Sequence, residues 1–70
     1  MSDAIGVVIN GEPKEVPAGL SVAELLAHLG MTAGRVAVER NLNIVPRTEW
    51  AATQVTADDR FEIVHLVGGG

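Results

Sequence analysis

The chain has 70 residues, a formal net charge of −4 and no cysteine. This length allows one small domain, predicted over residues 1–67. The lack of cysteine excludes disulfides and zinc–thiolate sites. The acidic balance argues against nucleic acid and anionic membrane surfaces as partners and favours a basic protein. No apolar run is long enough to span a membrane and the N-terminus has no signal-peptide pattern, so the cytoplasm is the expected location.

The first predicted element is a β-hairpin. Residues 5–9 are rich in β-branched side chains, which is typical of a strand. The dipeptide Asn10-Gly11 that follows tolerates positive φ angles, as a two-residue hairpin turn requires. Residues 12–16 are expected to pair back antiparallel, at the edge of the sheet because Pro13 and Pro17 cannot donate ladder hydrogen bonds.

A helix is predicted next, from signals at both of its ends. Ser21 is a good N-cap, and Glu24 three residues later completes a capping box. Gly30 is placed to end the helix. One apolar stripe at helical spacing connects the two ends, formed by Val22, Leu25, Leu26 and Leu29.

The second half of the chain is predicted to be mostly strands. We expect strands over residues 35–40, 44–45 and 61–67, a turn at 41–43, and one helical turn over 48–52 capped by Thr48. The element order is then β-β-α-β-β-β. A hairpin, one crossing helix and a returning strand predict an α+β fold, a mixed sheet with one main helix packed on one face. This is the β-grasp, or ubiquitin-like, architecture.

One helix can cover only one face of the sheet. The residues predicted to point toward the helix are Val7, Ile9, Leu25, Leu29, Val36, Val38, Phe61 and Ile63. Alternation along the strands then places Val8, Glu62, Val64 and Leu66 on the open face. The three apolar members, Val8, Val64 and Leu66, form a candidate docking patch, with scattered surface apolar residues as the alternative interpretation.

No catalytic or metal site is predicted within the folded part. His28 and His65 are too few for a convincing metal site and are interpreted as solvated or half-exposed side chains. Asp58-Asp59 is interpreted as a polar turn between strands, in preference to a pair of catalytic carboxylates. No serine has a defensible His and Asp partner, and no GxGxxG phosphate loop occurs.

The chain ends in three glycines, Gly68, Gly69 and Gly70. Glycine is about 7% of average protein sequence, so a run of three at one end is not expected by chance. A glycine tail has no Cβ and adopts any φ angle, so it can thread a channel that side chains would block. Residues 68–70 are therefore predicted to be a flexible tail that presents a reactive carboxylate to another protein.

The chain resembles the sulfur carrier family of thiamine biosynthesis (ThiS). The resemblance extends from Val7 to Gly70 and depends on an ordered set of segments rather than on one motif. These segments are residues 10–12, 21–26, 38–41, 44–47 with Trp50, and 61–70.

The resemblance implies a carrier and substrate, not an enzyme. A partner adenylyltransferase, similar to ubiquitin-activating enzymes, would use ATP to convert the Gly70 carboxylate to an acyl adenylate. A cysteine-derived sulfur donor would convert this to a thiocarboxylate, and the tail would deliver the sulfur to thiazole synthase. Gly70 is the modified residue, Gly68 and Gly69 give the tail access, and the chain itself binds no cofactor or metal.

Two alternatives remain at this point. One is the related small sulfur-carrier subunit of molybdopterin synthase, which shares the fold and the terminal diglycine. The other is a ubiquitin-like binding module with an inert tail. Deletion of Gly70 distinguishes the module from both carriers, and pull-down of thiazole synthase or of the large molybdopterin synthase subunit distinguishes the carriers.

Overall fold

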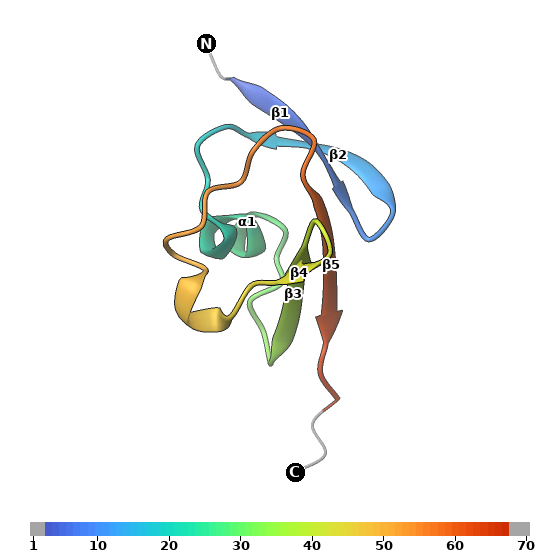
Figure 1. The fold of residues 1–70 in the computed structure, drawn as a ribbon, viewed down its shortest axis with the longest axis vertical. Coiled ribbons are helices and arrows are strands. Elements are labelled where there is room, and N and C mark those ends of the chain that lie inside the picture. Colours follow the sequence, from blue (N-terminus) through green and yellow to red (C-terminus); the bar gives the residue numbers. More distant parts are fainter. Residues whose placement is uncertain (1–2, 68–70) are drawn as a thin grey trace.

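The computed structural model describes residues 3–67 (Figure 1). Its elements are β1 (Ala4–Ile9), β2 (Glu12–Pro17), α1 (Val22–His28), β3 (Val36–Arg40), β4 (Asn43–Ile44), the 3-10 helix η1 (Arg47–Glu49) and β5 (Arg60–His65). The predicted order of strands and main helix is therefore confirmed. The predicted tail, Gly68 to Gly70, lies outside the described residues.

The five strands form one mixed sheet in the order β2-β1-β5-β3-β4. β1 and β5 run parallel, whereas the β1–β2, β3–β5 and β3–β4 pairs are antiparallel. β2 is at an edge, as its two prolines predict. Figure 1 shows α1 and η1 on the same side of the sheet, which gives the predicted β-grasp fold.

The turn between β1 and β2 has a second role. Asn10 and Gly11 both have positive φ, 51° and 83°, as expected for this turn. The Asn10 side chain also reaches β5. Its Oδ1 accepts a hydrogen bond from the Ile63 N–H at 2.7 Å, and its Nδ2 donates to the Ile63 carbonyl at 3.1 Å. Asn10 therefore extends the β1–β5 pairing beyond the end of β1.

The helix has the predicted ends. Ser21 Oγ accepts from the Glu24 N–H at 3.1 Å, and Glu24 Oε1 accepts from the Ser21 N–H at 2.9 Å, which is the predicted capping box. Gly30, with φ of 73°, follows the helix in the left-handed conformation. Because α1 has only seven residues, its stability depends on packing against the sheet.

The core confirms most of the predicted inward set. Six of its members are buried, namely Val7, Ile9, Leu25, Val38, Phe61 and Ile63. Leu29 and Val36 are only partly buried, since Leu29 is the C-cap of α1 and Val36 is the first residue of β3. The core also contains Val16, Val22, Leu26, Val45 and Val55.

The predicted bounds in the second half are wrong by one to three residues, beginning with β3 and β5, which start at Val36 and Arg60 instead of at residues 35 and 61. The helical turn begins at Arg47 after Pro46, so Thr48 lies inside it and makes no cap. β4 is Asn43–Ile44, because the turn before it contains only Asn41 and Leu42. β5 ends at His65 rather than at residue 67, because its neighbour β3 begins at Val36, the partner of His65.

Candidate functional site

The candidate site begins where the central strand of the sheet ends. β5 is held between β1 and β3. Beyond β5, the Leu66 N–H donates to the Arg35 carbonyl at 2.8 Å. Val67, the last described residue, is 98% exposed. The folded body therefore anchors the chain at Leu66, four residues before Gly70.

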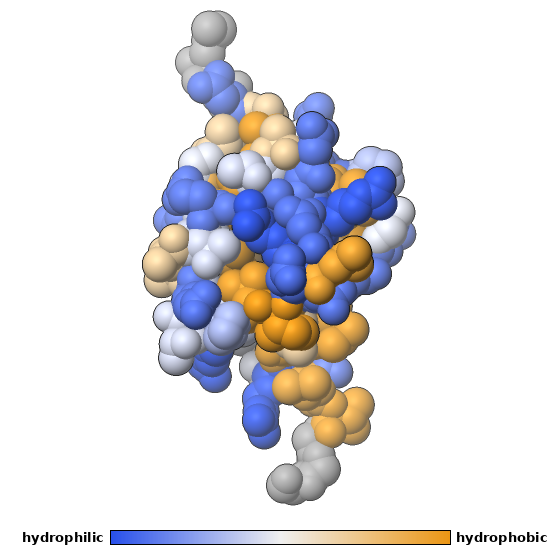
Figure 2. Space-filling model, in the orientation of Figure 1, coloured by the Kyte–Doolittle hydropathy of each residue, from blue (hydrophilic) through white to orange (hydrophobic). Residues whose placement is uncertain are grey.

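The face of the sheet opposite α1 is partly apolar, and we call it the open face. On this face, β3 pairs Ala37 with Val64 of β5, and it pairs Glu39 with Glu62 of β5 and with Ile44 of β4. These five side chains line a shallow hollow of about 140 Å³. Figure 2 shows hydrophobic residues gathered around β4 and the C-terminal half of β5.

The structure does not bring the three predicted docking residues together. Val64 is 54% exposed on the open face. Val8 is half-buried and lines an adjoining hollow with Leu42 and Glu62, so it lies at the margin of this face. Leu66 instead lines a larger hollow beside α1, because it lies beyond the last residue of β5, where the alternation predicted to residue 67 no longer applies.

Two exposed apolar residues of this region were not among the predicted docking residues. Ile44 is 66% exposed on the open face, and Leu42 is 90% exposed in the turn before it. Ile44 could have been found from the sequence, since it precedes Val45 in a predicted strand and alternation places one of the two on the open face. Leu42 has φ of 73°, a conformation that is unfavourable for leucine. Nothing in the sequence predicts that angle.

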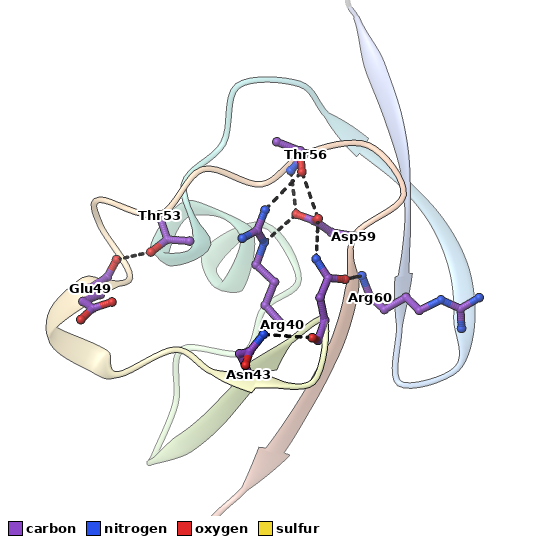
Figure 3. A network of polar contacts seen from close by, with 8 residues as sticks. Arg40, Asn43, Glu49, Thr53, Thr56, Asp59 and Arg60 are labelled. Atoms are coloured by element: carbon purple, nitrogen blue, oxygen red, sulfur yellow. Dashed lines mark hydrogen bonds and ion pairs between the residues drawn. The ribbon is translucent and has the colours of Figure 1, made fainter.

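The other end of the β3–β5 pair has a closed polar network (Figure 3). Asp59 is only 4% exposed. Its carboxylate accepts hydrogen bonds from Arg40 Nε at 2.8 Å, Asn41 Nδ2 at 3.1 Å and the Thr56 N–H at 2.8 Å. Burial alone would raise the pKa of Asp59, but the hydrogen bonds from Arg40, Thr56 and Asn41 outweigh it and hold the pKa below 3.8.

This network changes the interpretation of Asp58-Asp59. Asp58 lies in a turn with φ of 70°, as predicted, but Asp59 is a buried structural carboxylate. Each carboxylate oxygen of Asp59 accepts two hydrogen bonds, Oδ2 from Arg40 Nε and the Thr56 N–H, and Oδ1 from Asn41 Nδ2 and the Thr56 hydroxyl, so the acceptor sites of this group are used within the fold. His28 and His65 are both exposed.

Residues 3–67 contain no group of three or more His, Cys, Asp or Glu side chains that could hold a metal ion. Within the same part of the chain, no helix has the length and hydropathy needed to cross a membrane. A hollow of about 560 Å³ lies over β1 and β2 and is lined by no residue beyond Arg60. Among residues 3–67, the candidate functional features that remain are the open face and the C-terminal end of β5.

Comparison with known proteins gives a consistent result. A family model described as the ThiS family matches residues 7–70. The sulfur carrier protein ThiS of Escherichia coli is 31% identical over 64 residues, which cover 91% of this chain and 97% of that protein. A crystal structure of the thiamine biosynthesis protein ThiS from Geobacter metallireducens has a TM-score of 0.81 and 34% identity, covering 94% of this chain and all of the other.

A second group of relatives is much longer. A thiazole synthase of Paramagnetospirillum magneticum is 47% identical over 64 residues, which cover 91% of this chain but 20% of that protein. A thiazole synthase of Magnetococcus marinus is 44% identical over 62 residues, 89% of this chain and 19% of that protein. The chain thus spans about a fifth of the length of these relatives.

Proposed function

Because this chain belongs to the ThiS family, we propose that it is the sulfur carrier of thiamine biosynthesis and that it carries sulfur as a thiocarboxylate on Gly70. The observation that carries the proposal is the family match, which continues through Gly70. The fold supports it, because the strand that leads to the glycines is the central strand of the sheet. In this proposal the folded body positions the tail, and the tail is the reacting part.

The chemistry uses the Gly70 carboxylate as its only reacting group on this chain. An adenylyltransferase joins this carboxylate to the α-phosphate of ATP, and pyrophosphate leaves. Hydrosulfide derived from cysteine then attacks the acyl carbon and displaces AMP, with no change of oxidation state. The resulting thiocarboxylate enters thiazole synthase, which takes the sulfur. Both enzymes supply the catalysis, and the carrier supplies reach and recognition.

Recognition by the adenylyltransferase is assigned to the open face. Ile44 and Val64 offer exposed apolar area there, with Leu42 and Val8 at its margin. Glu39 and Glu62 are direct cross-strand partners, and neither forms an ion pair among residues 3–67. Two opposed carboxylates repel each other, so a basic side chain of a partner placed between them would relieve this repulsion.

The decisive experiment changes the tail and leaves the body intact. Deletion of Gly70 moves the terminal carboxylate back by up to about 3.6 Å. Misplacement by about 1 Å already costs orders of magnitude in an active site that acts by positioning. We therefore expect ATP-dependent thiocarboxylate formation to collapse, measured by intact mass as the exchange of one oxygen for sulfur. Gly69→Val should also fail, because a branched side chain restricts the backbone and fills the channel.

Both tail variants should melt like the wild type, since neither change touches the core. Full conversion of the chain that lacks Gly70 would reject the carrier proposal and favour a binding module with an inert tail. The docking assignment has its own test. Val64→Asp should weaken adenylyltransferase binding without unfolding the protein, whereas Ala18→Asp, the same charge change in the exposed turn after β2, should not.

A further inference from the structure

A second hollow, which we call the C-terminal hollow, lies on the helix side of the molecule. It has a volume of about 390 Å³ and forms where α1, the loop between α1 and β3, the start of β3, η1 and Leu66 meet. Its apolar lining includes Leu26, Met31, Val36, Trp50 and Leu66. Trp50 is fixed there, because its Nε1–H donates to the Val45 carbonyl at 2.9 Å. Much of the wall of this hollow is therefore apolar, and the loop between α1 and β3 forms one side of it.

Two arginines, Arg35 and Arg47, also line this hollow. Neither forms an ion pair among residues 3–67. The Arg47 guanidinium lies 6.0 Å from the centroid of the Trp50 ring. Since the whole chain has a net charge of −4 with only five Lys and Arg residues, two exposed arginines on one hollow are a local reversal of charge. Such a surface complements a segment with both an apolar side chain and a carboxylate.

The hollow also lies at the base of the tail. Leu66 lines it, and the Leu66 N–H donates a hydrogen bond to the Arg35 carbonyl. Gly70 is four residue steps beyond Leu66, a span of at most about 14 Å. An enzyme that binds Gly70 therefore comes within about 14 Å of Leu66 and of the hollow that Leu66 lines. Contacts here would set the direction from which the tail enters that enzyme.

We propose that the C-terminal hollow is the docking site for thiazole synthase, which inserts an apolar side chain into it and places a carboxylate against Arg35 and Arg47. This inference rests on the proposed function. Thiazole synthase is chosen because two proteins of that name contain a region 47% and 44% identical to this chain within one polypeptide. Such a fusion indicates that the two units work in contact. The open face then serves the adenylyltransferase, so each partner has its own surface.

The test uses the ¹⁵N-labelled full-length chain and unlabelled thiazole synthase from the same organism. The chain has one tryptophan, so its spectrum contains one indole N–H resonance, that of Trp50. We expect this resonance to shift on binding. The double variant Arg35→Glu/Arg47→Glu should weaken binding by about tenfold or more and flatten its dependence on salt. Arg60→Glu is the matched control, because Arg60 is also exposed but starts β5 at the other end.

Several outcomes would overturn the proposal. A complex that forms without a shift of the Trp50 resonance would place thiazole synthase elsewhere. Equal weakening by Arg60→Glu would show an effect of net charge alone. If the double variant binds the adenylyltransferase more weakly but binds thiazole synthase like the wild type, the hollow is a docking site for the adenylyltransferase and not for thiazole synthase. If charge reversal lowers the melting temperature, the milder pair Arg35→Gln/Arg47→Gln replaces it, with weakening of at least severalfold expected.

The failure of this proposal and that of the proposed function are distinguishable. The docking measurement needs no sulfur, ATP or thiocarboxylate. The double arginine variant should still become fully thiocarboxylated by the adenylyltransferase and a sulfur donor. If the wild type does not form a thiocarboxylate, the carrier function fails. If it does, and the double variant binds thiazole synthase like the wild type, only the hollow assignment fails.

Discussion

The two ends of the β3–β5 pair differ in how their charged side chains are placed: at one end they are paired, and at the other they are exposed to solvent. At one end, Arg40 and Asp59 lie 2.8 Å apart and the aspartate is buried. At the other end, where Val36 pairs with His65, Arg35 is exposed and forms no ion pair among residues 3–67. In the same described part of the chain, no buried side-chain nitrogen or oxygen lacks a hydrogen-bond partner.

This difference separates stability from recognition. The polar groups of the Asp59 end satisfy one another, so they hold the β3–β4 turn against the loop before β5 and offer nothing to a partner. At the tail end, apolar side chains and arginines remain in contact with solvent, where a partner can use them. Changes at the first end should therefore alter unfolding, and changes at the second should alter binding.

The largest expected loss of stability comes from a change in the hydrophobic core, which supports both ends of the β3–β5 pair. Phe61 is 1% exposed in the centre of the sheet. Phe61→Ala should destabilise the protein by about 3–5 kcal/mol, measured by urea unfolding. Total stability of a domain of this size is about 5 kcal/mol or less, so much of the variant should be unfolded. A variant that melts like the wild type would refute the packing of the helix on the sheet.

The next largest loss of stability is expected from a change in the polar network around Asp59. Arg40→Met should destabilise by about 2–3 kcal/mol, because it leaves the buried Asp59 carboxylate without its charged donor. Below its melting temperature the variant should form thiocarboxylate at the wild-type rate. The matched change Arg47→Met at the tail end should leave unfolding unchanged. Equal destabilisation by both variants would erase the distinction between the two ends.

The pH dependence sharpens the same point. The pKa of Asp59 is lowered in the folded state, so its stabilising effect is present above the unfolded value of about 3.8 and is lost as the pH falls through the folded value. The difference in unfolding free energy between the wild type and Asp59→Asn should therefore be constant near neutral pH and shrink below about pH 3.8. A difference that grows on acidification would contradict the assigned shift. Urea unfolding between pH 7 and pH 2.5 measures it.

A smaller effect is expected at Asn10. Asn10→Gly keeps the positive φ but removes both hydrogen bonds to Ile63, and should cost about 1–3 kcal/mol. Asn10→Asp keeps the acceptor and loses the donor, so it should fall between the wild type and Asn10→Gly. Equal stability of all three proteins in urea unfolding would show that the β1–β5 pairing does not need this side chain.

The sequence predicts the regular parts of this molecule well. The capping box of Ser21 and Glu24, the Asn10-Gly11 turn and the apolar alternation of β5 each have local signals, and local signals were enough for the fold. The Asp59 network has no such signal, since Arg40 and Asp59 are 19 residues apart and meet only after the strands pair. The position of Leu66 was missed for a related reason. The end of a strand depends on where the neighbouring strand in the sheet begins or ends, and apolar alternation along one strand does not contain this information.

The second role of Asn10 shows the same limit. Its turn is local and was predicted, but its bonds to Ile63 span 53 residues. The C-terminal hollow likewise joins α1, η1 and the end of β5, so no stretch of sequence indicates it. Charge pattern alone gives an acidic chain and favours a basic partner. Only the fold shows that two of the five basic residues gather at the base of the tail.

The smallest expected effect is a gain in stability at Leu42, and it tests whether recognition is maintained at a cost in stability. Leucine at φ of 73° is strained by about 1–2 kcal/mol, and with its side chain 90% exposed it makes few contacts in return. Leu42→Gly relieves the strain but adds backbone entropy to the unfolded state, so the net gain should be about 0.5–1 kcal/mol in urea unfolding.

If Leu42 is a docking residue, the same variant should raise the KM for the carrier in thiocarboxylate formation and leave kcat unchanged. Leu42→Asn is the matched control, because asparagine tolerates this backbone conformation and also removes the leucine side chain. Both variants should bind the adenylyltransferase equally weakly. A KM that stays at the wild-type value in both would show that the strain at Leu42 has no role in recognition and would confine the docking surface to Ile44 and Val64.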